Sequence, residues 1–159
     1  MSTVDLIVGP QHPALHEPEK FTFKIEGEQV VGVEPRVGYV HRGVEKAAEE
    51  RTYLQDIYLT GRICGICNTA HTTVYCQVVE ELHGKEIPPR AQYIRSIINE
   101  LHRVHSHLLL LGVAGELVGF DTLFMYLWRD REVVMDLIEK ITGNRLYTEI
   151  NTIGGTRRD

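Results

Sequence analysis

The sequence predicts an α+β fold, in which a small antiparallel β-hairpin or sheet at the N-terminal end is followed by a helical bundle. Apolar and polar residues alternate over 21–25, which is the period of a strand with one buried face. Apolar residues recur at intervals of three and four over 94–111, which is the period of an amphipathic helix. We therefore expect one domain of 159 residues that is β-rich over 1–42, helical over 43–143 and an extended tail over 144–159.

The β-rich part is predicted to contain three strands. Residues 3–8 are short, mostly apolar and often β-branched, and the following Gly-Pro pair ends the run. Residues 21–25 and 29–34 are extended segments on either side of a Glu-Gly-Glu turn. This arrangement is typical of a β-hairpin.

A polar loop over 9–20 joins the first strand to the hairpin. Its three prolines exclude a regular helix and stiffen the chain. Stiff loops set on strands often carry binding groups, so His12, His16 and Glu17 are candidate functional residues. A solvated connection whose histidines bond the backbone explains the same composition.

Five helices are predicted after residue 43. In order along the chain they cover 44–50, about 52–62, about 67–83, about 90–111 and about 122–141. The prolines at 88 and 89 restart the chain at the N-terminus of the fourth helix. Gly112, Gly115 and Gly119 are expected to loosen or end that helix.

Three histidines on the fourth predicted helix invite a metal-binding interpretation. His102, His105 and His107 do not share one face, because residues two apart diverge around a helix. We therefore favour packing or surface roles for them. Cys76, on the third helix, is interpreted as a buried structural thiol.

Composition narrows the function classes. A chain of 159 residues can bury a core without disulfides, and its three cysteines do not suggest a secreted disulfide framework. The net charge of -5 provides no general basic surface for nucleic acid. No signal-like segment and no long uncharged apolar stretch is present. We therefore expect a cytoplasmic chain that does not cross a membrane by itself.

The soft metal ligands are concentrated over 61–71. Cys64 and Cys67 are spaced to reach one metal ion, and Gly65 between them is expected to allow a tight turn. A closed site would need two more ligands, and no second cysteine pair is present. The pair is therefore half of a metal site, a redox dithiol or two buried thiols. A helix N-terminus at Cys67 would lower the thiol pKa values, and His71 could face the same site.

Five motifs occur in a fixed order along the chain. They are Gly9-Pro10-Gln11-His12-Pro13-Ala14, Gly38-Tyr39-Val40-His41-Arg42-Gly43-Val44-Glu45-Lys46, Arg62-Ile63-Cys64-Gly65-Ile66-Cys67, Ser106-His107-Leu108-Leu109, and Gly143-Asn144-Arg145 with Ile153-Gly154-Gly155. Together they resemble the large (catalytic) subunits of energy-converting membrane-bound nickel-iron hydrogenases. The same family includes the quinone-site (49 kDa) subunit of complex I, which has lost the cysteines. The two cysteines therefore indicate the hydrogenase branch.

The resemblance implies that Cys64 is a terminal nickel ligand and that Cys67 bridges nickel to an iron carrying carbon monoxide and cyanide. It implies proton transfer by Glu17, and positions beside the metal for Arg62 and His71, where hydrogen bonds would tune the sulfurs. The family completes this site with a second Cys-x-x-Cys beyond the present chain. The fold is therefore expected to be incomplete relative to the full-length family.

The resemblance thus predicts the N-terminal portion of a hydrogenase large subunit, either a split-gene product or a fragment. It would contribute half of the cysteine ligands for reversible H2 oxidation and proton reduction. Expected partners are a small subunit with an iron-sulfur cluster, a segment or chain bearing the second Cys-x-x-Cys, and ion-translocating membrane subunits that hold the chain at the inner face of the cell membrane. The alternatives are a non-catalytic scaffold in a complex I-like membrane oxidoreductase and, more distantly, an independent protein with a zinc or redox Cys-x-x-Cys.

Overall fold

The structure of the protein is a computed structural model that describes residues 3–158. The chain forms two compact units, Met1–Gly43 and Val44–Asp159. This boundary lies one residue after the predicted change from β-rich to helical sequence. The predicted α+β fold, with an N-terminal antiparallel sheet followed by helices, is confirmed.

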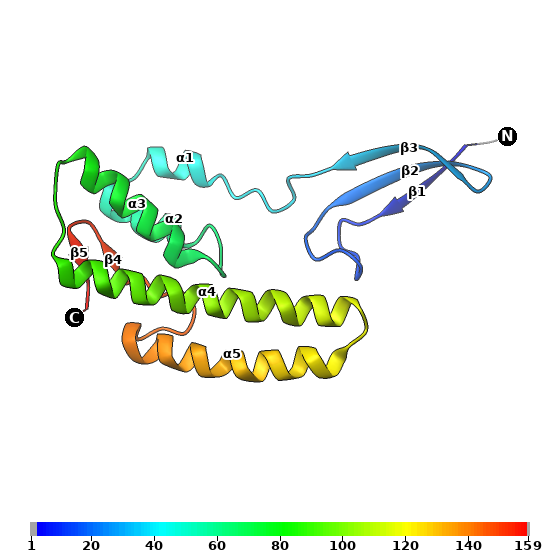
Figure 1. Cartoon of the computed structure of the whole chain (residues 1–159). Coiled ribbons are helices and arrows are strands. Elements are labelled where there is room, and N and C mark those ends of the chain that lie inside the picture. The colour runs from blue at the N-terminus through cyan, green and yellow to red at the C-terminus, as the bar shows by residue number, and fades with distance from the viewer. Residues whose placement is uncertain (1–2, 159) are drawn as a thin grey trace. The chain divides into compact units, whose positions relative to one another are not determined.

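The first unit is a three-stranded antiparallel sheet in the order β1-β2-β3 (Figure 1). Its strands are β1 (Val4–Val8), β2 (Lys20–Glu26) and β3 (Gln29–Arg36). Gly9 starts the loop after β1 with a φ of 92°, and a Cβ there would lie 1.9 Å from the Glu19 carbonyl oxygen. Only glycine fits at this position.

The predicted buried face of this sheet is not found within the unit. No described side chain of residues 3–43 is buried, and Phe21 and Phe23 of β2 are only half-buried. The physical reason is that a single sheet needs a second layer of structure to bury one face.

The second unit contains the five predicted helices, which are confirmed. They are α1 (Val44–Glu49), α2 (Tyr53–Gly61), α3 (Asn68–Leu82), α4 (Pro89–Leu117) and α5 (Asp121–Thr142). Thr52 and Gln55 form a reciprocal capping box at the start of α2. Gly143 ends α5 in the left-handed conformation, with a φ of 81°. Within residues 3–158, no helix has the length and apolar character required to cross a membrane.

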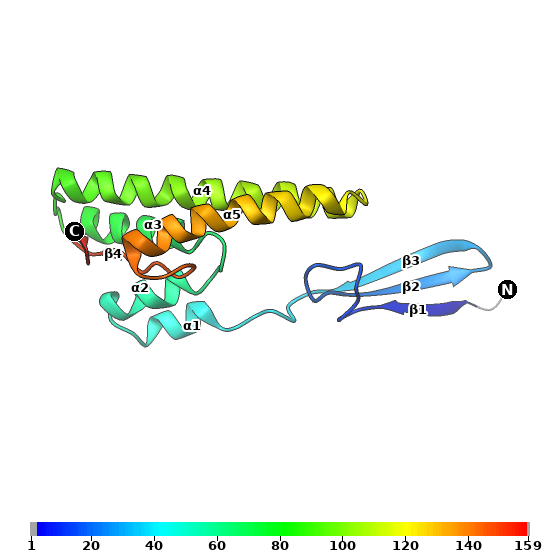
Figure 2. The same cartoon turned by 90° about the horizontal axis from the view of Figure 1, so that it is seen from below.

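Helix α4 is longer than the sequence predicted, because it continues through Gly112 and Gly115. A Cβ on Gly112 would lie 3.0 Å from the Trp128 ring, and one on Gly115 would lie 3.3 Å from Leu123. These glycines are therefore the close contact points between α4 and α5, which lie side by side (Figures 1 and 2). The packing offsets their low helix propensity, and only Gly119 lies in the turn between the helices.

The segment after α5 is not simply the extended tail that the sequence predicted. Residues 151–156 form a short hairpin of β4 (Asn151–Thr152) and β5 (Gly155–Thr156). The hairpin contacts α3 and α4, and Ile150 is 2% exposed. Its two strands have two residues each, which is too short for a periodic pattern to reveal them.

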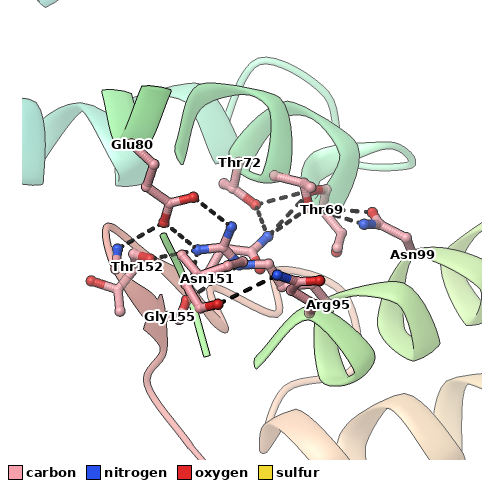
Figure 3. Close-up of polar contacts among 12 residues, drawn as sticks. Thr69, Thr72, Glu80, Arg95, Asn99, Asn151, Thr152 and Gly155 are labelled. Carbon is pink, nitrogen blue, oxygen red and sulfur yellow. Dashed lines mark hydrogen bonds and ion pairs between the residues drawn. The ribbon is translucent and has the colours of Figure 1, made fainter. Parts of the chain in front are cut away.

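A buried ion pair fixes this hairpin to the helices. Arg95 of α4 donates to both carboxylate oxygens of Glu80 of α3, at 3.0 and 2.7 Å, and both side chains are buried. Arg95 also donates to the carbonyl oxygens of Thr152 and Gly155, each at 2.8 Å. The Gly154 N–H donates to Glu80 at 2.7 Å. Figure 3 shows that the two charges are satisfied by each other and by the hairpin backbone.

Polar contacts continue along the same seam (Figure 3). The Asn151 amide donates to the hydroxyls of Thr72 and Thr73, each at 2.9 Å. The hydroxyls of Thr69 and Thr148 lie 2.9 Å apart. The fully buried apolar side chains of this unit are few, and they are Ile57, Cys76, Ile98 and Ile138.

Two histidines of α4 are buried, whereas His107 is exposed. His105 is fully buried, and its Nε2 lies 2.5 Å from an Arg131 guanidinium nitrogen. Burial lowers the pKa of His105 to about 4, and the positive charge of Arg131 acts in the same direction. Burial also lowers the pKa of His102. Packing is therefore the role of these two residues in the fold.

We predict that Glu80→Gln lowers the free energy of unfolding by about 3 kcal/mol, because the Arg95 charge would stay buried without its counter-charge. Chemical denaturation measures this difference. Glu81→Gln is the matched control, because Glu81 is the exposed next residue of the same helix. Equal stabilities of the two variants would contradict the assigned role of the ion pair.

We predict that the free energy of unfolding falls as pH is lowered from about 6.5 to about 4. In this range the unfolded chain binds a proton at His105 and the folded chain does not, so protonation favours unfolding. The loss from His105 approaches about 3 kcal/mol. In denaturation curves measured across this range, His105→Gln should reduce the slope and the exposed-site variant His107→Gln should leave it unchanged. A slope that His105→Gln does not change would contradict this prediction.

Candidate metal centre

The Cys-x-x-Cys motif lies at the junction of α2 and α3, with Cys67 at the N-cap of α3. The Cys64 sulfur accepts hydrogen bonds from the backbone N–H groups of Ile66, at 3.4 Å, and of Cys67, at 3.3 Å. Such bonds stabilise negative charge on a sulfur. Both thiols are partly exposed. The loop therefore presents two accessible sulfurs, and its own backbone N–H groups already hydrogen-bond one of them.

The expected role of Gly65 in this turn is wrong. Gly65 does not have a left-handed backbone, and a Cβ there would make ordinary contacts, at 3.5 Å to the Tyr147 hydroxyl and 3.9 Å to Leu146. The turn is instead stabilised by the two N–H···S bonds on Cys64.

The expected lowering of the thiol pKa values is also wrong for Cys67. Desolvation, the hydrogen bond with Cys64 and the charge of Cys64 raise the pKa of Cys67 to about 11. A backbone hydrogen bond acts in the opposite direction but does not outweigh desolvation and the neighbouring Cys64. Burial raises the pKa of Cys76 to about 11, as expected for a structural thiol.

His71 follows Cys67 by one helical turn, and its backbone N–H donates to the Cys67 carbonyl at 3.2 Å. Both residues line an open, mostly apolar hollow of about 580 Å³, together with Val74 and Val78. The structure thus brings His71 to the same side of α3 as one thiol. Cys67 also borders a second hollow of about 470 Å³, which His102 lines from α4.

Arg62, two residues before Cys64, is fixed by the segment after α5. Its guanidinium lies 2.5 Å from a Glu149 carboxylate oxygen and 3.9 Å from the centre of the Tyr147 ring. Sequence reasoning missed both partners. They lie more than 80 residues further along the chain, and nothing in their local sequence indicates the contact.

Glu17 lies in the loop between β1 and β2, in the first unit, and its side chain is exposed. His16 is exposed in the same loop, and His12 Nδ1 accepts the Ala14 N–H at 3.2 Å. That bond is the backbone role considered for these histidines. The two thiols belong to the second unit.

The described residues by themselves do not form a complete metal site. Among residues 3–158, no group of three or more histidine, cysteine, aspartate or glutamate side chains is arranged to hold a metal ion. Cys64 and Cys67 can supply two soft thiolate ligands to a metal whose other ligands come from elsewhere.

Comparison with known families gives two matches. Residues 42–111 match the nickel-dependent hydrogenase family. They include the loop over 63–67 that carries Cys64 and Cys67, which we call the thiol loop. Residues 118–159 match the 49 kDa subunit of respiratory-chain NADH dehydrogenase.

Individual relatives match nearly the whole chain. This chain is 49% identical to the membrane-bound hydrogenase subunit alpha of Pyrococcus furiosus. The match covers 98% of this chain and 36% of that protein. The chain is 43% identical to the carbon monoxide-induced hydrogenase of Rhodospirillum rubrum over its full length, which is 44% of that protein. The chain therefore spans less than half the length of these relatives.

A solved structure shares the fold. It is that of the membrane-bound sulfane sulfur reductase, an archaeal respiratory membrane complex, with a TM-score of 0.87 and 36% sequence identity over 99% of this chain and 42% of the matched chain. The motif of the thiol loop, the two family matches and the shared fold all indicate the same protein family. The chain belongs to the family that contains the large subunits of nickel-iron hydrogenases and the 49 kDa subunit of respiratory-chain NADH dehydrogenase.

Proposed function

We propose that this chain forms part of the large subunit of a membrane-bound nickel-iron hydrogenase and supplies half of the cysteine ligands of its metal centre. The observation that carries the proposal is the loop at the α2–α3 junction, where Cys64 and Cys67 are partly exposed and the Cys64 sulfur accepts two backbone N–H bonds. The match of residues 42–111 to nickel-dependent hydrogenases supports it.

The donor set of this loop fits such a centre. Two thiolates are soft ligands, and with a second pair they complete the four-sulfur site that the family resemblance implies. Cys64 and Cys67 would hold a nickel-iron centre, as the family resemblance implies. When bound, this centre supplies the reversible heterolytic cleavage of H2.

The chain's own residues would hold and support the thiols. Arg62 lies next to the thiol loop and is held by Glu149 and Tyr147. Its guanidinium is therefore a cationic hydrogen-bond donor fixed near the loop. His71 shares a hollow with Cys67 and can hydrogen-bond a group bound there. The family resemblance assigns proton transfer to Glu17, and its exposed carboxylate can exchange a proton with water.

The remaining ligands and the electron path would come from other segments or subunits. A second Cys-x-x-Cys would complete the site, and a small subunit with an iron-sulfur cluster would carry electrons. Relatives named as membrane-bound hydrogenase subunits support a position at the membrane through partner subunits. Ion translocation by those partners belongs to the same proposal.

A second candidate function is a non-catalytic scaffold in a complex I-like oxidoreductase. Two observations favour it: residues 118–159 match the NADH dehydrogenase subunit, and the same fold occurs in a sulfane sulfur reductase complex. Metal analysis of the purified complex separates the candidates. Nickel with iron supports the hydrogenase, no metal at this subunit supports the scaffold, and zinc alone supports an independent thiol site.

We predict that Cys64→Ala or Cys67→Ala abolishes both hydrogen uptake and hydrogen evolution in the assembled complex and removes its nickel, because each variant lacks one ligand. Activity assays and elemental analysis measure the two effects. Cys76→Ala is the matched control, since Cys76 is a buried thiol of α3 outside the loop and should leave the nickel content unchanged. Unchanged activity in the loop variants would remove these cysteines from the site.

We predict that Glu17→Gln slows hydrogen–deuterium exchange catalysed by the complex while nickel and iron stay bound, because an amide cannot accept and release the proton. Glu19→Gln, in the same loop, is the control and should exchange at the normal rate. Loss of the metals in Glu17→Gln would instead show that Glu17 has a structural role.

A further inference from the structure

One distant segment, residues 146–149, binds the residues on both sides of the thiol loop. Arg62, before the loop, pairs with Glu149 at 2.5 Å and lies over the Tyr147 ring. Within the loop, a Cβ added to Gly65 would lie 3.5 Å from the Tyr147 hydroxyl and 3.9 Å from Leu146, so the segment lies close to Gly65. Just after the loop, the Asn68 amide donates to the Leu146 carbonyl at 2.7 Å and to the Gly65 carbonyl at 3.5 Å. Residues 146–149 therefore bind the residues on either side of the loop and lie close to its middle.

This segment is itself held firmly. Thr148 bonds Thr69 at 2.9 Å, and Ile150 is 2% exposed. The hairpin that follows is fixed by the buried pair of Glu80 and Arg95. The segment is thus attached to α3 and α4 independently of its contacts with the loop, and it can act as a rigid support for the loop.

The backbone at Glu149 is unusual. Among residues 3–158 it is the only non-glycine residue with a positive φ, at 42°. A side chain in the left-handed region costs about 1 kcal/mol, and such strain gathers at functional sites. At this position the strained backbone carries the carboxylate that meets Arg62.

We propose that Glu149 is a positioning residue for the thiol pair. It holds the Arg62 guanidinium against Tyr147 and thereby fixes the backbone turn that carries Cys64 and Cys67. The inference rests on the proposed function in one respect, because order in this turn matters for chemistry only if the thiols bind metal. The support itself is a property of the folded chain.

The test is amide hydrogen exchange over 63–67 in the full chain without added metal. Glu149→Gln should raise the exchange rate of this segment about three- to five-fold, the effect of losing a partly exposed ion pair. Exchange over 151–156 should not change. An unchanged rate over 63–67, or an equal rise throughout the chain, would overturn the proposal.

Two further variants separate positioning from general stability. Glu149→Gly removes the carboxylate and also relieves the strained backbone, so it should loosen 63–67 without lowering the midpoint of thermal unfolding. Asp136→Asn is the matched control, because it breaks a 2.7 Å surface ion pair with Arg145 that does not touch the loop. A normal exchange rate over 63–67 in Glu149→Gly would contradict a role for the carboxylate.

A double-mutant comparison tests whether Glu149 acts through Arg62. Arg62→Gln combined with Glu149→Gln should exchange no faster than either single variant, and multiplied effects would overturn the coupling. Nickel content of the assembled complex is the second measurement, and Glu149→Gln should lower it about two-fold or more. Absence of nickel in the unmodified complex would refute the proposed function, whereas the exchange results would still decide the role of Glu149.

Discussion

The buried ion pair of Glu80 and Arg95 is the contact on which the arrangement of the second unit depends. Two charges taken out of water are tolerated only when each is neutralised and fully hydrogen-bonded, and here the hairpin backbone completes the bonding. Helices α3 and α4 and the chain after α5 must therefore come together at one place. Because the hairpin is fixed there, the residues just before it reach the thiol loop, so a structural interaction in the core determines the surroundings of the candidate metal ligands.

The thiol loop illustrates how a short motif is preorganised without being closed. Two N–H···S bonds orient Cys64, and Cys67 lies at the N-cap of α3. Desolvation and the neighbouring Cys64 nevertheless raise the pKa of Cys67, so its thiol keeps the proton. A metal must replace that proton, so binding would release it. The fold holds two thiols that could bind a metal, and the described residues supply no third ligand beside them. A hydrogenase subunit similar in sequence and a sulfane sulfur reductase complex similar in fold are named for different activities, which is expected when function resides in a site and not in the scaffold.

The α4–α5 pair combines close packing with poorly satisfied polar groups. Gly112 and Gly115 let the helices approach, while His105 and Arg131 meet in the interior with no described carboxylate bonded to them. The desolvation of these groups lowers the histidine pKa and keeps the ring neutral. This seam therefore makes the stability of the unit sensitive to acid, separately from the chemistry of the thiols.

The sequence by itself determined the features that depend on neighbouring residues. Strand alternation, proline and glycine boundaries and helical periodicity located the three strands of the first unit and the five helices. The spacing of Cys64 and Cys67 identified the candidate ligands. Only the tertiary structure decided what depends on distant contacts: the continuation of α4 through two glycines, the burial of Arg95 with Glu80, and the pairing of Arg62 with Glu149. The physical reason is sequence distance: the partners of the two ion pairs lie 15 and 87 residues apart. No local pattern encodes which distant side chain a residue will contact.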